Sequence, residues 1–174
     1  MSRIPVSLDP WQPRARHLEF EGDLGPDDLP RLRADALPGH PLRVHAQFQL
    51  ERGSLDEMRL SGVISGELWH TCQRCLQPMA WEFRLEPDAV LLPLEGTRAG
   101  LSEGDDFVEL EADGLLRPAA WIEEEILLAW PLVPRHADCE PAAGPEFTEG
   151  ERGDNPFAVL EQLKKGGGPD RDDP

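Results

Sequence analysis

The chain has 174 residues, 34 of them acidic and 17 basic, which gives a formal net charge of −17. Its hydrophobic fraction of 39% is sufficient for the core of one domain and excludes a wholly disordered chain. No apolar run approaches the roughly 18 residues of a membrane span, and the N-terminus lacks the apolar stretch of a signal peptide. We therefore expect a cytoplasmic protein without membrane contacts.

The negative charge is concentrated in the second half of the chain. Residues 1–87 carry 10 basic and 13 acidic groups, whereas residues 88–174 carry 7 and 21. An acidic surface repels phosphate and attracts basic partners, so direct nucleic-acid binding by the second half is disfavoured. The acidity favours contacts with basic proteins, and solubility alone is the simpler alternative.

Apolar and polar residues alternate along most of the first half, which is typical of β-strands. The expected elements, in chain order, are a strand at 16–21, a polar helix at 26–37, and strands at 42–51, 58–71, 79–86, 89–94 and 107–112. Within the strand at 58–71, Gly62 and Gly66 are expected to mark bends or bulges.

After these strands the hydrophobic period becomes helical. One apolar stripe is formed by Leu115, Ala119, Ile122, Ile126 and Ala129. Pro118 suits the first turn of this helix and Pro131 stops it, while residues 123–125, all Glu, are expected on its solvated side. Strands followed by one helix predict an α+β fold, with an antiparallel sheet or partly closed barrel packed by one main helix.

The C-terminal part predicts a short helix at the end of a polar linker. The expected segments are an α+β domain at 1–139, an acidic flexible linker at 140–154, a short C-terminal docking helix at 155–165 and a disordered tail at 166–174. Asn155 and Pro156 suit the start of the helix. Phe157, Leu160 and Leu163 form a narrow apolar edge that needs a surface, either on its own domain or on a partner.

Three cysteines in an apparently cytosolic chain argue against a disulfide framework. Cys72 and Cys75 lie where two strands meet in a tight turn, and two thiolates at this spacing can bind one Zn²⁺. His136 and Cys139 repeat the spacing about sixty residues later, so the four residues form a candidate structural zinc site. Two alternatives stay open: a redox pair, which needs its first Cys at a helix N-terminus, and reduced thiols packed at the hairpin end.

The sequence predicts no catalytic residue and no other cofactor. The remaining histidines, His17, His40, His45 and His70, lack a neighbouring acid or nucleophile pattern, and no phosphate-binding or hydrolase motif occurs. The five tryptophans are not interleaved with basic residues, so packing explains them better than base stacking.

Five segments carry a family resemblance. They are LDP at 8–10, LEFEG at 18–22, CQRCLQP at 72–78, EEEILLAWPLVPRH at 123–136, and NPFAVL at 155–160, continuing through Lys164. In this order they resemble the YceD family, whose members are called large ribosomal RNA subunit accumulation proteins. The resemblance implies a small factor, bacterial rather than plastid, that supports synthesis, processing or stability of large-subunit (23S-type) ribosomal RNA. It implies no established enzymatic activity.

Combined with the charge, this resemblance favours a non-catalytic ribosome-assembly factor. Such a factor contacts basic ribosomal or assembly proteins through its acidic half and C-terminal helix, and ribosomal RNA only indirectly. One alternative is an RNA-processing or redox protein that uses Cys72 and Cys75. Another is direct RNA binding through the arginines of the first half, Arg14, Arg16, Arg31 and Arg33.

Overall fold

The computed structural model of this protein describes residues 3–12, 17–53, 57–93 and 104–142. The chain separates into one unit at Met1–Pro141 and another at Ala142–Pro174. The predicted linker beyond residue 142, the docking helix with Phe157, Leu160 and Leu163, and the tail lie outside the described residues.

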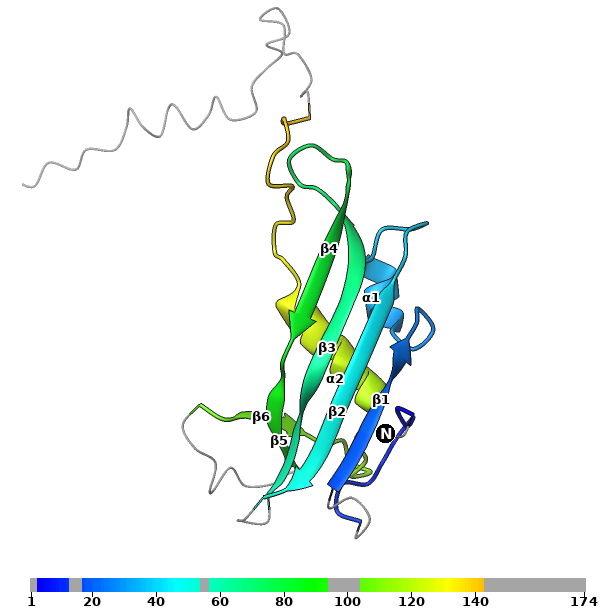
Figure 1. Cartoon of the computed structure of the whole chain (residues 1–174), viewed down its shortest axis with the longest axis vertical. Helices are drawn as coiled ribbons and strands as arrows, with labels where there is room; N and C mark the ends of the chain where they lie inside the picture. The colour runs from blue at the N-terminus through cyan, green and yellow to red at the C-terminus, as the bar shows by residue number, and fades with distance from the viewer. Residues whose placement is uncertain (1–2, 13–16, 54–56, 94–103, 143–174) are drawn as a thin grey trace, which may run out of the picture. The chain divides into compact units, whose positions relative to one another are not determined.

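A six-stranded sheet forms the body of the first unit (Figure 1). Its strands are β1 (His17–Leu24), β2 (Arg43–Arg52), β3 (Met58–Thr71), β4 (Pro78–Leu85), β5 (Asp88–Leu92) and β6 (Asp106–Glu109). The path β1-β2-β3-β5-β6 is open, and β4 pairs with β3 outside this path. All pairs are antiparallel except β5 with β6, which is parallel. The α+β class is therefore confirmed, but the sheet is mixed and, among the described residues, does not close into a barrel.

Strand β3 is the centre of the sheet. One edge pairs with β2 from Met58 to Glu67, and the other pairs with β5 near Met58 and with β4 up to Thr71. The β2–β3 ladder continues through Gly62 and Gly66 without a bulge. A Cβ at Gly62 would lie 2.1 Å from the carbonyl oxygen of Gln47, so these glycines allow close backbone approach rather than an interruption of the ladder.

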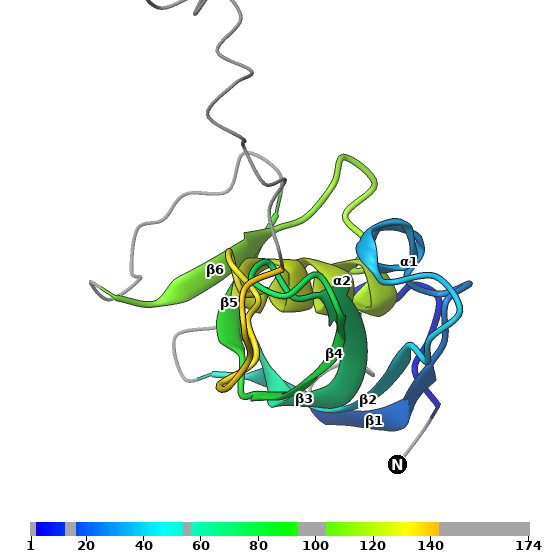
Figure 2. The same ribbon diagram turned by 90° about the horizontal axis from the view of Figure 1, so that it is seen from above.

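Helix α2 (Pro118–Ala129) covers one face of the sheet. Seen from above, the sheet curves into a trough and α2 lies across its open side, next to α1 (Pro30–Asp35) (Figure 2). As predicted, α2 has a proline in its first turn, and it ends two residues before Pro131. Within the described ranges, neither helix is long and apolar enough to cross a membrane. The polar helix expected at 26–37 is limited to the six residues of α1.

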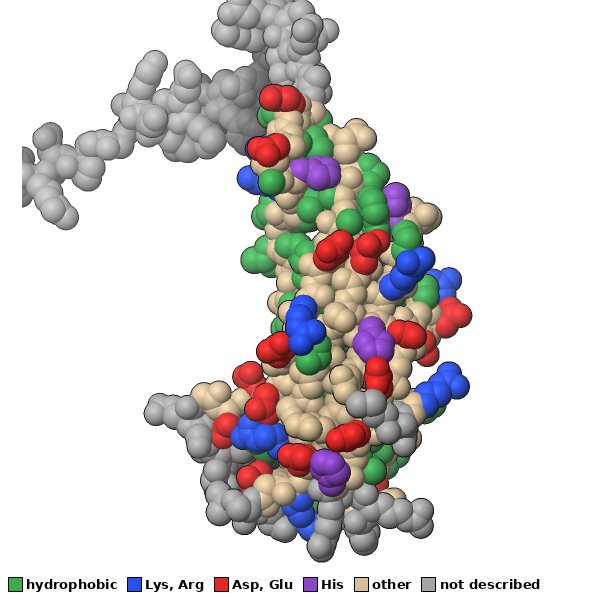
Figure 3. Space-filling view, in the orientation of Figure 1, with side chains coloured by type: hydrophobic (Ala, Val, Ile, Leu, Met, Phe, Trp, Pro, Cys, Tyr) green, Lys and Arg blue, Asp and Glu red, His purple; other side chains and the backbone are tan. Residues whose placement is uncertain are grey.

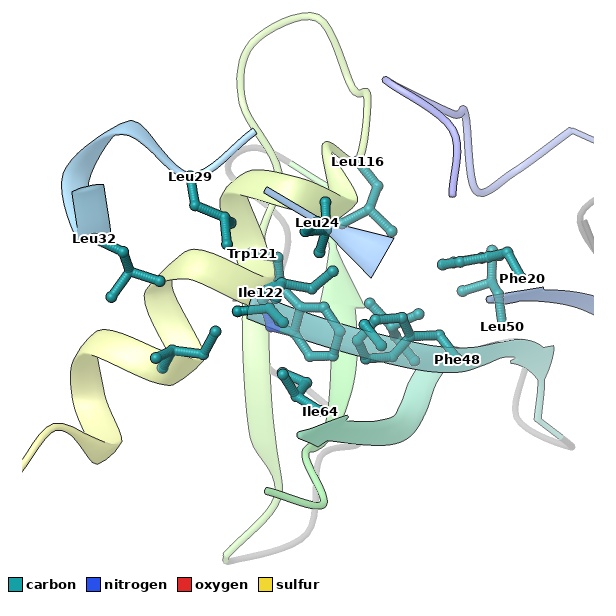
Figure 4. Packing of buried hydrophobic residues seen from close by; sticks show 14 of the residues in the cluster. Phe20, Leu24, Leu29, Leu32, Phe48, Leu50, Ile64, Leu116, Trp121 and Ile122 are labelled. Atoms are coloured by element: carbon teal, nitrogen blue, oxygen red, sulfur yellow. The ribbon is translucent and has the colours of Figure 1, made fainter. Parts of the chain in front are cut away.

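The core lies between the sheet and α2. The alternation predicted for β2 is observed, since Val44, Ala46, Phe48 and Leu50 are buried. The Phe48 ring packs 4.9 Å from the ring of Trp121 on α2 (Figure 4). Each such buried apolar side chain contributes roughly 1.5–3 kcal/mol, so this layer holds α2 on the sheet.

The expectation that the three glutamates of α2 face solvent is wrong for Glu123. Its side chain is only 4% exposed, and its carboxylate accepts the backbone N–H groups of Arg31 at 2.7 Å and Leu32 at 3.0 Å. Helix α1 has no capping side chain of its own and begins at Pro30, which has no N–H. Glu123 therefore caps α1 from α2 and ties the two helices together.

Candidate metal centre

The tip of the β3–β4 hairpin is a tight turn built on Cys72. The N–H of Cys72 donates to the carbonyl of Gln77, and the N–H of Leu76 donates to the carbonyl of Cys72, both at 2.9 Å. Leu76 has a φ of 60°, in the left-handed region. This backbone path brings Cys72 and Cys75 close enough for their thiols to interact.

The segment that follows α2 returns to this turn. We refer to residues 130–139 as the strap. The N–H of Gln73 donates to the strap carbonyl of Pro134 at 2.8 Å. The Arg74 guanidinium donates to the carbonyl of His136 at 3.0 Å and to the thiol of Cys139 at 3.1 Å. These bonds hold the strap against the hairpin tip.

Four ligand atoms converge where the strap meets the tip. The donor atoms of Cys72, Cys75, His136 and Cys139 all lie within 4.8 Å of one another. The Sγ atoms of Cys72 and Cys139 are 3.8 Å apart, and Cys75 Sγ is 3.3 Å from His136 Nδ1. A tetrahedral Zn²⁺ with ordinary bond lengths would place two sulfurs about 3.8 Å apart, and a sulfur and a nitrogen about 3.6 Å apart. These two separations are close to those of a tetrahedral ion, so the four residues could hold one metal ion.

The Cys72 thiol is stabilised in its ionised form. Burial is the largest single influence on its pKa and raises it. The backbone N–H groups of Cys75, Arg74 and His136 act in the opposite direction and lower the pKa of Cys72 to about 5. The tip thus presents one thiolate, the form that binds metal.

The Cys75 thiol resists ionisation. The N–H of Gln77 is the largest influence on its pKa and lowers it, but burial and the adjacent thiols of Cys72 and Cys139 outweigh that influence. The pKa of Cys75 therefore lies above its ordinary value. A bound divalent cation would remove this repulsion and allow all three cysteines to be thiolates.

Arg74 is a component that sequence reasoning missed. Zn²⁺ with three thiolates and a neutral histidine carries one negative charge, and the Arg74 guanidinium, bonded to Cys139, lies beside it. Such outer contacts orient ligands and balance the charge of a metal site. The signal in the sequence was a basic residue inside the Cys72–Cys75 pair.

Cys72 does not lie at the start of a helix, which is the position of the first cysteine in a thioredoxin-like redox pair. Cys72 directly follows β3, and β4 begins at Pro78 on the other side of the turn. All three cysteines are free thiols. The geometry favours a ligand cluster over a thioredoxin-like pair.

The arginines considered for RNA binding do not form a free basic patch where they are described. Arg31 pairs with Glu124, and Arg33 pairs with Asp27 at 2.9 Å. Arg14 and Arg16 lie outside the described residues. On the face drawn in Figure 3, acidic and basic side chains are interspersed over the lower half, and hydrophobic side chains gather in the upper half.

Comparisons with known proteins cover nearly the whole chain. The family model described as "Large ribosomal RNA subunit accumulation protein YceD" matches residues 60–164, which include all four donor residues. A curated relative of that same name from Haemophilus influenzae is 27% identical over 177 residues, covering 94% of this chain and 97% of the relative. No solved structure matches the chain.

Proposed function

This chain belongs to the YceD family, and from that membership we propose that it supports the accumulation of large-subunit (23S-type) ribosomal RNA. The observation that carries the proposal is the family match over residues 60–164, extended to nearly full length by the named relative. Both donor pairs and the segment at 155–164 lie inside the matched range.

We propose further that the protein acts by binding, without catalysis. Its net charge of −17 suits basic ribosomal or assembly proteins as direct partners, with ribosomal RNA contacted only indirectly. The predicted docking helix, with Phe157, Leu160 and Leu163, supplies a second contact in this proposal.

In this proposal the metal centre is structural and holds zinc. Cys72, Cys75, His136 and Cys139 would fill all four positions of a tetrahedral ion. A catalytic zinc keeps one position for water or substrate, so the donor set supports a structural tie between hairpin tip and strap. The alternative of an RNA-processing enzyme built on Cys72 and Cys75 would require an open position.

Deletion or depletion of the protein tests the function directly. We expect the ratio of large-subunit to small-subunit ribosomal RNA to fall, and sucrose gradients to show fewer complete large subunits. Re-expression of the wild-type chain should restore both readings. Unchanged ratios and gradients, including after growth in the cold, would refute the proposal.

A further inference from the structure

A groove lies beside the metal centre, between the loop that follows α1 and the strap. Its volume is about 750 Å³. It is lined by residues 34–38, by Leu127 and strap residues 130–134, and by His70, Thr71 and Gln73 of the hairpin. We name it the strap groove, and we propose that it is the docking site for a Lys/Arg-rich segment of a basic partner protein, anchored by apolar side chains. This inference rests on the proposed function and names the partner class.

The strap carries apolar side chains that are exposed to solvent and not part of the core. Leu132 is 98% exposed, and its neighbour Val133, which also lines the groove, is more than half exposed. Leu128, on the last turn of α2, is exposed as well. Single exposed apolar residues are ordinary, but a group of them bordering a concavity marks an interaction site.

The charge of the groove selects the chemistry of its occupant. In the described part of the chain, Asp35 is the one charged residue that lines the groove, and no Lys or Arg lines it. The C-terminal end of α2 opens on the groove at Leu127 and Trp130, and its last turn contains no basic residue. A helix C-terminus carries partial negative charge and favours cations. A lysine or arginine of the partner would therefore lie near complementary charge and next to the exposed apolar side chains of Leu132 and Val133.

His70, one of the residues that line the groove, is held between tryptophan side chains. His70 is 5% exposed, and its Nε2 has no hydrogen-bond partner among the described residues. Its ring lies 4.3 Å from that of Trp130, edge to face, and 5.8 Å from that of Trp81. Because this Nε2 atom is itself enclosed, His70 contributes a fixed aromatic wall to the groove rather than a hydrogen-bonding group for the occupant.

The same features disfavour two other occupants, RNA and a second copy of this chain. A phosphate of RNA would approach Asp35 and the negative end of α2 without any basic residue to receive it. A second copy of this chain would bring another net charge of −17.

Site-specific photocrosslinking of the full-length protein tests the proposal. A benzophenone amino acid replaces Leu132, and in the matched control it replaces Val6, which is 90% exposed in the segment before β1. The probe is total protein extracted from salt-washed large ribosomal subunits. We expect adducts at position 132 and not at position 6, with the attachment point mapped to a Lys/Arg-rich segment of a basic protein. Equal labelling at both positions, no labelling, or adducts only with this chain's own copy would overturn the proposal.

Charge variants supply the second measurement. Leu132→Lys with Val133→Lys removes both apolar contacts and adds charge of the partner's own sign, so it should reduce capture of the crosslinked protein at least tenfold, whereas Val6→Lys should not. Because these side chains are exposed, the melting temperature of each variant should stay near the wild-type value. Intact 50S subunits added as a further probe should yield no crosslink from position 132 to ribosomal RNA, and such a crosslink would contradict a protein occupant.

The crosslinking and deletion experiments distinguish an error in the assignment of the strap groove from an error in the proposed function. If position 132 captures nothing while deletion still lowers large-subunit ribosomal RNA, the groove assignment is wrong and the function stands. If position 132 captures a basic protein while deletion leaves the ratio of ribosomal RNAs unchanged, the groove stands and the function is wrong.

Discussion

Replacing Glu123 by alanine removes the acceptor that joins α2 to the start of α1. The carboxylate receives two backbone N–H groups, at 2.7 and 3.0 Å, in a site that is 4% exposed. Loss of an N-terminal cap costs about 1 kcal/mol, and a hydrogen bond to a charged group contributes about 1.5–3 kcal/mol. These contributions overlap, so we expect the free energy of unfolding to fall by about 2–4 kcal/mol.

The adjacent Glu124→Ala is a matched control. It makes the same chemical change on the same helix, but Glu124 is 49% exposed and its carboxylate pairs with the exposed side chain of Arg31. A surface ion pair of this kind contributes at most about 1 kcal/mol. Glu123→Gln, which keeps an acceptor oxygen, should give an intermediate loss.

Urea unfolding followed by tryptophan fluorescence measures these differences, because Trp121 lies in the core on α2, the helix that carries Glu123. For a chain of this size, the expected loss in Glu123→Ala corresponds to a melting temperature lower by about 5–15 °C. If Glu123→Ala and Glu124→Ala are equally stable within about 0.5 kcal/mol, the capping role of Glu123 is refuted.

Three other variants address the metal, pH dependence and the C-terminal segment. The purified protein should contain about one Zn²⁺ per chain, measured by elemental analysis. A chelator should destabilise wild type by about 3–4 kcal/mol, since the metal closes a loop of 64 residues from Cys72 to His136. The same chelator should leave the stability of Cys72→Ser unchanged. An equal effect of the chelator on both proteins would indicate that the cysteines are packed as reduced thiols without metal. A hydrogen bond to Asp23, at 2.9 Å, raises the pKa of His45 above 6.5. The stabilisation by this hydrogen bond should therefore be full below about pH 6 and should disappear as the pH rises through the raised pKa. Measured by urea unfolding, the free energy of unfolding of His45→Gln should be lower than that of wild type by under about 1 kcal/mol at pH 5.5 and equal to it at pH 9. A difference that grows with pH would contradict this. The Phe157→Ala, Leu160→Ala double variant should lose partner capture with little change in melting temperature; a drop of many degrees would place the segment in the core, and no change in either would exclude docking.

Local patterns in the sequence, namely the alternation of apolar and polar residues and the positions of prolines, predicted individual strands and helices of the fold. Alternation over residues 42–51 identified β2 because one face of that strand packs against α2 and the other faces solvent. The proline in the first turn of α2 and the stop before Pro131 followed from backbone sterics alone. Such local causes are visible in a single sequence.

Features that depend on distant contacts were not predictable in this way. Glu123 is one of three consecutive glutamates, and only its contacts with the backbone of Arg31 and Leu32, far away in the chain, make it a helix cap. The parallel pairing of β6 with β5 has no local signature, because it depends on the path of the chain between the two strands. Arg74 likewise gains its role only when Cys139 is beside it.

The metal centre and the strap groove share one structural element, and this couples the two proposals. The first half of the strap lines the groove and its second half supplies His136 and Cys139, while Gln73 both lines the groove and donates to Pro134 at 2.8 Å. A metal bound to the four donors would hold the strap to the hairpin tip and would therefore also set the separation of the groove walls. Coupling between two binding events is reciprocal, so if both proposals hold, zinc would strengthen partner binding by the same factor by which the bound partner would strengthen zinc binding. A strap ordered by zinc before the partner arrives also leaves less conformational entropy to lose on docking.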